Sequence, residues 1–129
     1  MYIQHISIPR PPGQESRQQA IAFYGELLGM QPKPEPDSIK KLDLVWFQIG
    51  QMELHCFAEE PLDDKSGRHF CLAVADVDTV RQKLEAAGYE TMDPDRILGR
   101  PRFFCQDPFG NKIEITTIVG DYLQLEQAN

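Results

Sequence analysis

The residues of this chain best suited to chemistry are its three histidines and one of its glutamates. His5, His55 and His69 each fall in a segment that predicts a β-strand, and Glu114 lies between two isoleucines in KIEIT. Because side chains alternate between the faces of a strand, Glu114 should point away from the face of its apolar neighbours. Neutral imidazoles and a carboxylate suit Zn, Ni, Co, Mn or Fe(II). These four residues predict a divalent-metal site with positions open to water or substrate.

Each of these residues also has a simpler interpretation when it is taken alone. A single strand histidine is more often a hydrogen-bonded structural residue, and a strand glutamate is often only the solvent-facing side chain of an amphipathic strand. Glu53 shares a face with His55, so it is either an alternative ligand or merely exposed. The subset His5, His69 and Glu114 would match the two-histidine, one-carboxylate set of non-haem iron. The joint placement of the histidines in an internal repeat favours the metal.

The elements that must position these residues follow from the hydrophobic pattern. Strands are predicted at residues 2–8, 42–49, 52–57, 69–74, 102–106 and 112–118. One helix is predicted over 15–28, ending at Gly29, and a second begins at Asp76 or Asp78 and ends at Gly88. Prolines predict a loop at residues 9–13 and an extended segment at residues 32–36. Turns are predicted at Gly50-Gln51 and at residues 107–111. The polar end of the chain from Gly120 is expected to fray.

The two halves of the chain repeat the same order of elements. HISI at 5–8 and HFCL at 69–72 both read histidine, large apolar, small, large apolar, and each is followed by a helix that stops at a glycine. We therefore expect an α+β fold of two βαβββ modules, module one at 1–60 and module two at 67–119, within one domain of 1–129. The polar stretch 59–68 is the predicted linker. Two such sheets facing each other would enclose a cavity with the histidines pointing into it.

The amino-acid composition excludes several classes of protein. The 129 residues are 41% hydrophobic and 26% charged, which is enough to bury a core. A net charge of −7 without a basic run argues against nucleic acid and anionic membranes as partners. Neither a membrane-spanning apolar run nor a secretory signal is expected. Cys56, Cys71 and Cys105 are odd in number and form no CxxC pair, so they predict reduced, buried thiols in a cytoplasmic protein.

Several segments resemble the vicinal oxygen chelate superfamily, the glyoxalase, bleomycin resistance and extradiol dioxygenase family. They are the strand that holds His5, AFYGELLGM at 22–30, ELHCF at 53–57, HFCLAVADVDTVRQKLEAAG at 69–88 and RFFCQDPFGNKIEI at 102–115. The resemblance covers nearly the whole chain. It implies a cup-shaped half-barrel of two βαβββ modules around a metal, and a homodimer. The metal positions of the family fall on His5, His55, His69 and Glu114.

The resemblance also implies a reaction class. A divalent metal would bind two neighbouring oxygens of a small-molecule substrate in lyase or isomerase chemistry, with Glu114 as ligand and possible general base. Arg102 would meet an anionic substrate group, unless it is a surface charge. Phe57, Phe104 and Trp46 would line the cavity, unless they are plain core. Glyoxalase I enzymes usually carry glutamate where this chain has His55, which argues against that particular activity.

The same candidate residues are compatible with two other functions. One is a ring-cleaving extradiol-type dioxygenase, for which Tyr122 would have to supply acid–base chemistry because the chain has no fourth histidine. The other is a metal-free protein of the bleomycin-resistance type that sequesters a drug or metabolite. Metal content and oxygen uptake would separate the three.

Overall fold

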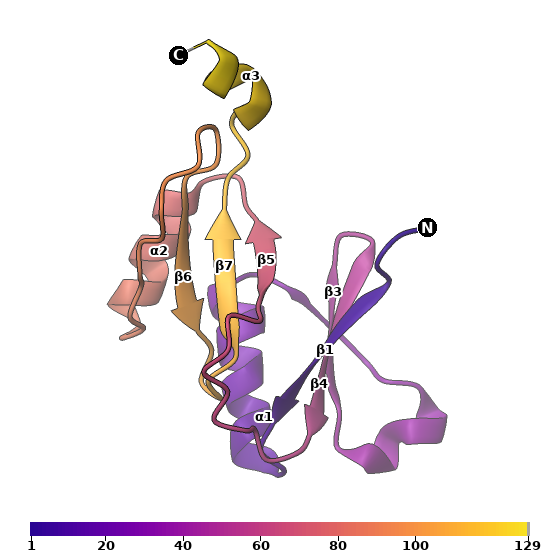
Figure 1. The fold of residues 1–129 in the computed structure, drawn as a ribbon. Helices are drawn as coiled ribbons and strands as arrows, with labels where there is room; N and C mark the ends of the chain where they lie inside the picture. The colour runs from indigo at the N-terminus through magenta and orange to yellow at the C-terminus, as the bar shows by residue number, and fades with distance from the viewer. Residues whose placement is uncertain (129) are drawn as a thin grey trace. The chain divides into compact units, whose positions relative to one another are not determined.

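The computed structural model describes residues 1–128 and divides into two units. The first comprises Met1–Asp64 with Pro108–Asn111, and the second comprises Lys65–Asp107 with the chain from Lys112 onward. Each unit holds one sheet and its own helices, which gives an α+β fold of two βαβββ-like modules (Figure 1). None of the helices within residues 1–128 combines the length and the apolar character needed to cross a membrane.

The first unit contains a four-stranded sheet in the order β1-β4-β3-β2. Its elements are β1 (His5–Arg10), α1 (Gln14–Ala20), η1 (Ile21–Leu27), β2 (Gln31–Lys33), η2 (Asp37–Leu42), β3 (Val45–Ile49) and β4 (Met52–Ala58). Strands β1 and β4 are parallel, and the other pairs are antiparallel. Parallel pairing places β1 and β4, the first and last strands of the module, side by side in the sheet, so side chains from these two strands lie next to each other.

The apolar faces of the first unit explain its packing. The helix predicted over 15–28 is confirmed at 14–27, with its second half wound as a π-helix. Ala20, Phe23 and Tyr24 are fully buried, and the ring of Tyr24 lies 5.9 Å from that of Phe47 on β3. The predicted turn is also confirmed, and Gly50 takes a φ of 54°, which a glycine adopts at little cost.

Two sequence predictions for this unit were displaced. The first strand was predicted at 2–8 but runs from 5 to 10, into the first residues of the segment expected to be a loop. The proline-rich segment is extended as predicted, and residues 31–33 pair with β3 as a short edge strand, β2, a position that tolerates proline. Residues 37–42 form a 3₁₀ turn of helix, so the strand expected from 42 begins at Val45.

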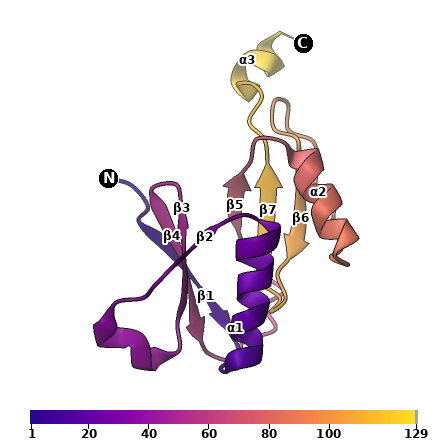
Figure 2. The ribbon, with the colours of Figure 1, turned by 180° about the vertical axis from the view of Figure 1, so that it is seen from behind.

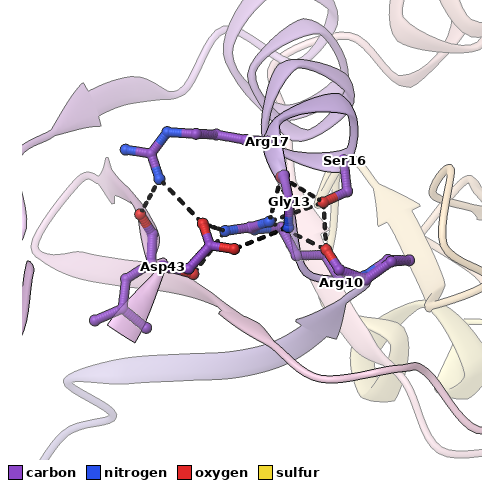
Figure 3. A network of polar contacts seen from close by, with 7 residues as sticks. Arg10, Gly13, Ser16, Arg17 and Asp43 are labelled. Carbon is purple, nitrogen blue, oxygen red and sulfur yellow. Dashed lines mark hydrogen bonds and ion pairs between the residues drawn. The ribbon is translucent and has the colours of Figure 1, made fainter. Parts of the chain in front are cut away.

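A polar cluster fastens the beginning of α1 to the segment before β3 (Figure 3). The Asp43 carboxylate accepts a hydrogen bond from the backbone N–H of Gly13 at 2.9 Å. Arg17 donates to the carbonyl of Leu44 at 2.7 Å and lies 3.6 Å from Asp43 Oδ1. Asp43 has a φ of 55°, in the left-handed region that short polar side chains tolerate.

The second unit contains a three-stranded sheet in the order β5-β7-β6. Its elements are β5 (Phe70–Ala73), α2 (Val77–Ala86), β6 (Arg102–Gln106), β7 (Lys112–Thr116) and α3 (Tyr122–Gln127). Strands β5 and β7 are parallel, β6 and β7 are antiparallel, and α2 lies alongside β6 (Figures 1 and 2). Asp76 caps α2, accepting from the N–H groups of Asp78 and Thr79, so the first of the two candidate caps is the one used.

This unit also departs from the sequence predictions. A βαβββ module has a strand directly after its helix, but here a single bridge between Met92 and Phe104 takes that place. The prolines and the glycine between these two residues limit further hydrogen bonding between strands. The end predicted to fray forms α3, because Asp121 accepts from the N–H of Leu123 and begins a helix. Cys56 and Cys105 are buried as expected, but Cys71 is exposed, because it lies on the face of β5 that does not enter the core.

Candidate metal centre

Two of the predicted ligands meet in the second unit. Glu114 lies in the middle of β7, between the fully buried Ile113 and Ile115, and alternation turns its side chain to the other face. His69 directly precedes β5, the parallel neighbour of β7. The two side chains are 3.0 Å apart, from His69 Nε2 to Glu114 Oε1. The pairing of β5 with β7 therefore brings together residues that are 45 positions apart in the chain.

The ring of His69 is held in one orientation by the backbone. Its Nδ1 lies 2.8 Å from the carbonyl oxygen of Gly67. A carbonyl only accepts, so Nδ1 carries the proton, and Nε2 faces the Glu114 carboxylate. Metal-binding histidines show this arrangement, with the second ring nitrogen fixed by a backbone carbonyl. The geometry leaves Nε2 and Oε1 as the two donors of this pair.

Two side chains of β6, Arg102 and Phe104, lie beside the His69–Glu114 pair. Arg102 Nη1 lies 3.4 Å from Glu114 Oε2, and Arg102 Nη2 donates to the carbonyl of Asp95 at 2.8 Å. The arginine side chain is only 15% exposed, so it is not a free surface charge. The ring of Phe104 packs edge-on against His69 at 4.9 Å, and Lys112 Nζ lies 4.4 Å from the centre of the same ring.

Cys71 is the residue aligned with Glu114 across the β5–β7 pair. Burial of its thiol and the neighbouring Glu114 carboxylate together raise the pKa of Cys71 to about 11. The thiol is therefore neutral near pH 7 in the metal-free chain, and thiolate is the form that binds metals. Among the nearby groups, the imidazole and the carboxylate are the better donors.

The other two predicted ligands meet in the first unit. His5 on β1 and His55 on β4 stack with ring centres 4.1 Å apart and planes 17° apart. The other side of the His55 ring stacks on Trp46 of β3, at 3.7 Å and 3°. His5 Nδ1 lies 2.7 Å from the side-chain oxygen of Gln4, which leaves Nε2 as the nitrogen of His5 that is available to bind a metal. The parallel pairing of β1 with β4 produces this stack.

Glu53, the alternative ligand, is engaged with two neighbours. Its Oε1 lies 2.9 Å from His55 Nε2, and its Oε2 accepts from Lys33 Nζ at 2.5 Å. The hydrogen bonds from Lys33 and His55 lower the pKa of Glu53 to about 2. Phe57, two residues beyond His55 on the same face of β4, is half-buried. Glu53 therefore orients His55 as the structure stands.

The structure thus assembles the predicted ligands as two pairs, one in each unit. Among residues 1–128, no three histidine, cysteine, aspartate or glutamate side chains are grouped so as to hold a metal ion. Each pair is an incomplete set by itself, since zinc and the related divalent ions take at least three protein donors. The donors themselves, imidazole nitrogens and one carboxylate, fit those ions.

The residues that orient the ligands were not predicted from the sequence. Gln4 directly precedes His5, and Gly67 lies two residues before His69, but neither carries a signal that its side-chain or backbone oxygen would bond the ring. Lys33 was missed because β2 was not predicted, and its bond to Glu53 depends on the β2–β3–β4 register. No local pattern would have found it.

With the fold and both pairs in view, comparison with known proteins defines the class. The family model described as "Glyoxalase/Bleomycin resistance protein/Dioxygenase superfamily" matches residues 14–115. This chain belongs to that superfamily.

Solved structures agree with this assignment. The chain is 33% identical to a protein of Bacillus anthracis described as a glyoxalase family protein, with a TM-score of 0.82 over 92% of this chain and 95% of that one. A lactoylglutathione lyase from Agrobacterium tumefaciens is 20% identical, with a TM-score of 0.65 over 90% and 92%. The fosfomycin resistance protein FosX from Listeria monocytogenes is 14% identical, with a TM-score of 0.78 over 98% and 97%. The last two share the fold. No curated protein matches the chain.

Proposed function

We propose that this chain is a divalent-metal-dependent enzyme that performs lyase or isomerase chemistry on a small molecule with two neighbouring oxygens. The proposed ligands are His5 and His55 from the first unit and His69 and Glu114 from the second. The observation that carries the proposal is the 3.0 Å approach of His69 Nε2 to Glu114, with Nδ1 fixed on the Gly67 carbonyl. Membership of the superfamily supports it.

The geometry of the His69–Glu114 pair suits a cation. His69 Nε2 and Glu114 Oε1 face each other at 3.0 Å, and the Gly67 carbonyl fixes the other ring nitrogen. An imidazole nitrogen and a carboxylate oxygen are both atoms that divalent ions take as ligands, so His69 and Glu114 would hold part of the coordination shell.

The bound ion would polarise the two substrate oxygens and stabilise the negative charge that develops on them. Glu114 supplies a carboxylate that can accept a proton from the substrate, within reach of the same place. Arg102 holds Glu114 Oε2 and presents a positive charge to an anionic substrate group. Phe104 and Phe57 provide apolar surface that helps to exclude water. We also propose a homodimer as the working form.

Elemental analysis of protein purified without a histidine tag tests the proposal. About one divalent ion per chain is expected, with the affinity lowered at least about tenfold in His69→Gln and in Glu114→Gln. Glu85→Gln is the matched control, because Glu85 lies on exposed surface of α2. Failure of the untagged protein to bind Zn, Ni, Co, Mn or Fe(II) in direct titration would contradict the proposal.

A ring-cleaving dioxygenase is the second candidate, favoured by the donor set itself. Two imidazoles and one carboxylate, from His5, His69 and Glu114, are the ligands typical of non-haem Fe(II) enzymes. Iron in the purified protein together with oxygen uptake on catechols would support it over the first candidate. Metal-free protein that binds a ligand equally well after Glu114→Gln would instead indicate sequestration.

A further inference from the structure

A cavity of about 450 Å³ is lined entirely by residues of the second unit, and neither His69 nor Glu114 is among them. It is bounded by the first turns of α2, by the segment 94–102 and by Val119. Its volume falls in the range of small-molecule sites. The charged residues that line it are Asp78, Arg81, Asp95, Arg96, Arg100 and Arg102.

The charge of this lining is opposite to that of the protein. The chain carries a net charge of −7 and contains seven arginines, four of which line this one cavity. Only two aspartates oppose them there. Arg96 and Arg100 are exposed at this hollow, where charges of one sign repel one another and raise the local concentration of anions. The concentration of arginines therefore points to an anionic occupant.

Two of the arginines are already engaged. Arg81 is paired with Asp93 and donates to Thr91 Oγ1 at 3.1 Å. Arg102 is bonded to Glu114 and to the carbonyl of Asp95, yet its buried Nε has no acceptor among residues 1–128. A buried donor without a partner is rare in native proteins and commonly marks a missing ion or water.

The other two arginines are available. Within residues 1–128, neither Arg96 nor Arg100 has a carboxylate at ion-pair distance, and Arg100 lies only over the ring of Tyr122, at 5.0 Å. The N-terminus of α2, beside the cavity, does not provide free N–H groups for an anion. The N–H of Val77 is bonded to Thr117 Oγ1, and those of Asp78 and Thr79 are bonded to Asp76.

We propose that this cavity binds a small organic anion whose phosphate or carboxylate group is held by Arg96 and Arg100. The planar guanidinium fork matches the paired oxygens of both groups. The remaining lining is largely apolar and would hold the body of the ligand. It consists of Gly99 and the side chains of Val77, Pro94, Ile97, Pro101, Phe103 and Val119. This site is independent of the proposed metal centre, although Arg102 borders both.

The test uses three probes at constant ionic strength: inorganic phosphate, phenyl phosphate and benzoate. Amide chemical shifts of the ¹⁵N-labelled full chain report both affinity and location. We expect shifts in residues 94–102 and at the start of α2, and tighter binding of phenyl phosphate than of inorganic phosphate because of the apolar lining. Tighter binding of benzoate than of phenyl phosphate would support the carboxylate form of the proposal.

The double variant Arg96→Gln with Arg100→Gln should weaken binding at least about tenfold. Its control, Arg68→Gln with Lys41→Gln, removes the same charge outside the cavity and should leave binding unchanged. Equal weakening in both would show a general charge effect and overturn the proposal. Binding that survives Arg96→Gln with Arg100→Gln but is lost in Glu114→Gln would place the anion at the metal centre and overturn it as well.

Discussion

The guanidinium of Arg10 is completely buried and lies 2.6 Å from Asp43 Oδ1, on a residue 33 positions further along the chain (Figure 3). Arg10 also donates to Ser16 Oγ at 2.8 Å and to the carbonyls of Pro11 and Gly13 at 3.2 Å. One side chain thus connects the end of β1, the beginning of α1 and the segment before β3. Three segments of the first unit therefore meet at one buried charge.

Asp43→Asn should destabilise the protein by about 2 kcal/mol. Removal of one partner of a buried ion pair leaves the other charge uncompensated, and the cost is reduced here because the Asp43 side chain is 35% exposed. Asparagine tolerates the left-handed backbone at this position, so no strain is added. Urea denaturation measures the change. Asp37→Asn, which removes a carboxylate that is 95% exposed, should stay within about 0.5 kcal/mol.

The same carboxylate makes stability depend on pH. Burial raises the pKa of Asp43, but the Gly13 N–H and the Arg10 guanidinium outweigh it, so the pKa of this carboxyl lies below its ordinary value of 3.8. A group whose pKa is lowered by folding contributes stability above its unfolded pKa, and this is lost as the pH falls through the folded pKa. The stability difference between wild type and Asp43→Asn should therefore be constant above about pH 5 and shrink below about pH 4.

Unfolding midpoints in urea at a series of pH values between about 6 and 3 test this expectation. Asp37→Asn serves as the reference for the general effect of removing one carboxylate. A difference between wild type and Asp43→Asn that does not change over this range would show that the ion pair is not what the substitution disrupts.

Gly99→Ala should destabilise the second unit by about 2 kcal/mol or more. Gly99 has a φ of +78°, and an added Cβ would lie 2.7 Å from the carbonyl oxygen of Gly120 and 2.9 Å from Leu125 Cδ1. The carbonyl is a backbone atom and cannot move aside cheaply, so steric overlap adds to the left-handed strain. Urea denaturation again measures the loss.

The control is Gly67→Ala, because a Cβ at Gly67 would meet nothing within 4 Å. We expect that change to stay within about 0.5 kcal/mol. If Gly99→Ala were as mild as the control, the contact between residues 99 and 120 would not exist in solution.

The sequence was sufficient for those features that depend on local alternation. Glu114 was correctly placed opposite its neighbouring isoleucines, and His55 opposite Leu54 and Cys56, because both strands have a fully buried face. Period-two patterns of this kind survive in any tertiary context that buries one face. The helices ending at glycines and the hairpin at Gly50 followed from equally local chemistry.

Features that depend on distant pairing were not predictable. Nothing near Arg10 in the sequence indicates that its charge is buried, since its partner, Asp43, directly follows η2 and lies 33 residues away. The bond from Lys33 to Glu53 requires an edge strand whose proline argues against it locally. The joining of the His5–His55 and His69–Glu114 pairs around one metal stays a prediction, because it concerns residues from two units.

Cys71 should react slowly with iodoacetamide although the residue as a whole is exposed. Partial burial of its thiol and the adjacent Glu114 carboxylate raise the pKa of Cys71 to about 11, so at pH 8 the thiolate is roughly a hundred times scarcer than for an ordinary cysteine. Higher nucleophilicity of the thiolate offsets part of this, and we expect alkylation roughly tenfold slower than in the unfolded chain. Peptide mass spectrometry of metal-free protein between about pH 7 and 11 measures the rate.

Glu114→Gln removes the negative charge beside the thiol, so it should lower the pKa of Cys71 and speed its alkylation at pH 8. Glu85→Gln, on the exposed surface of α2, should leave the rate unchanged. Cys56 and Cys105 are buried and should stay unmodified in the folded protein, which makes the Cys71 peptide the only one to follow. Equal rates for wild type and Glu114→Gln would mean that the carboxylate does not face the thiol in solution, and that β5 and β7 pair in a different register.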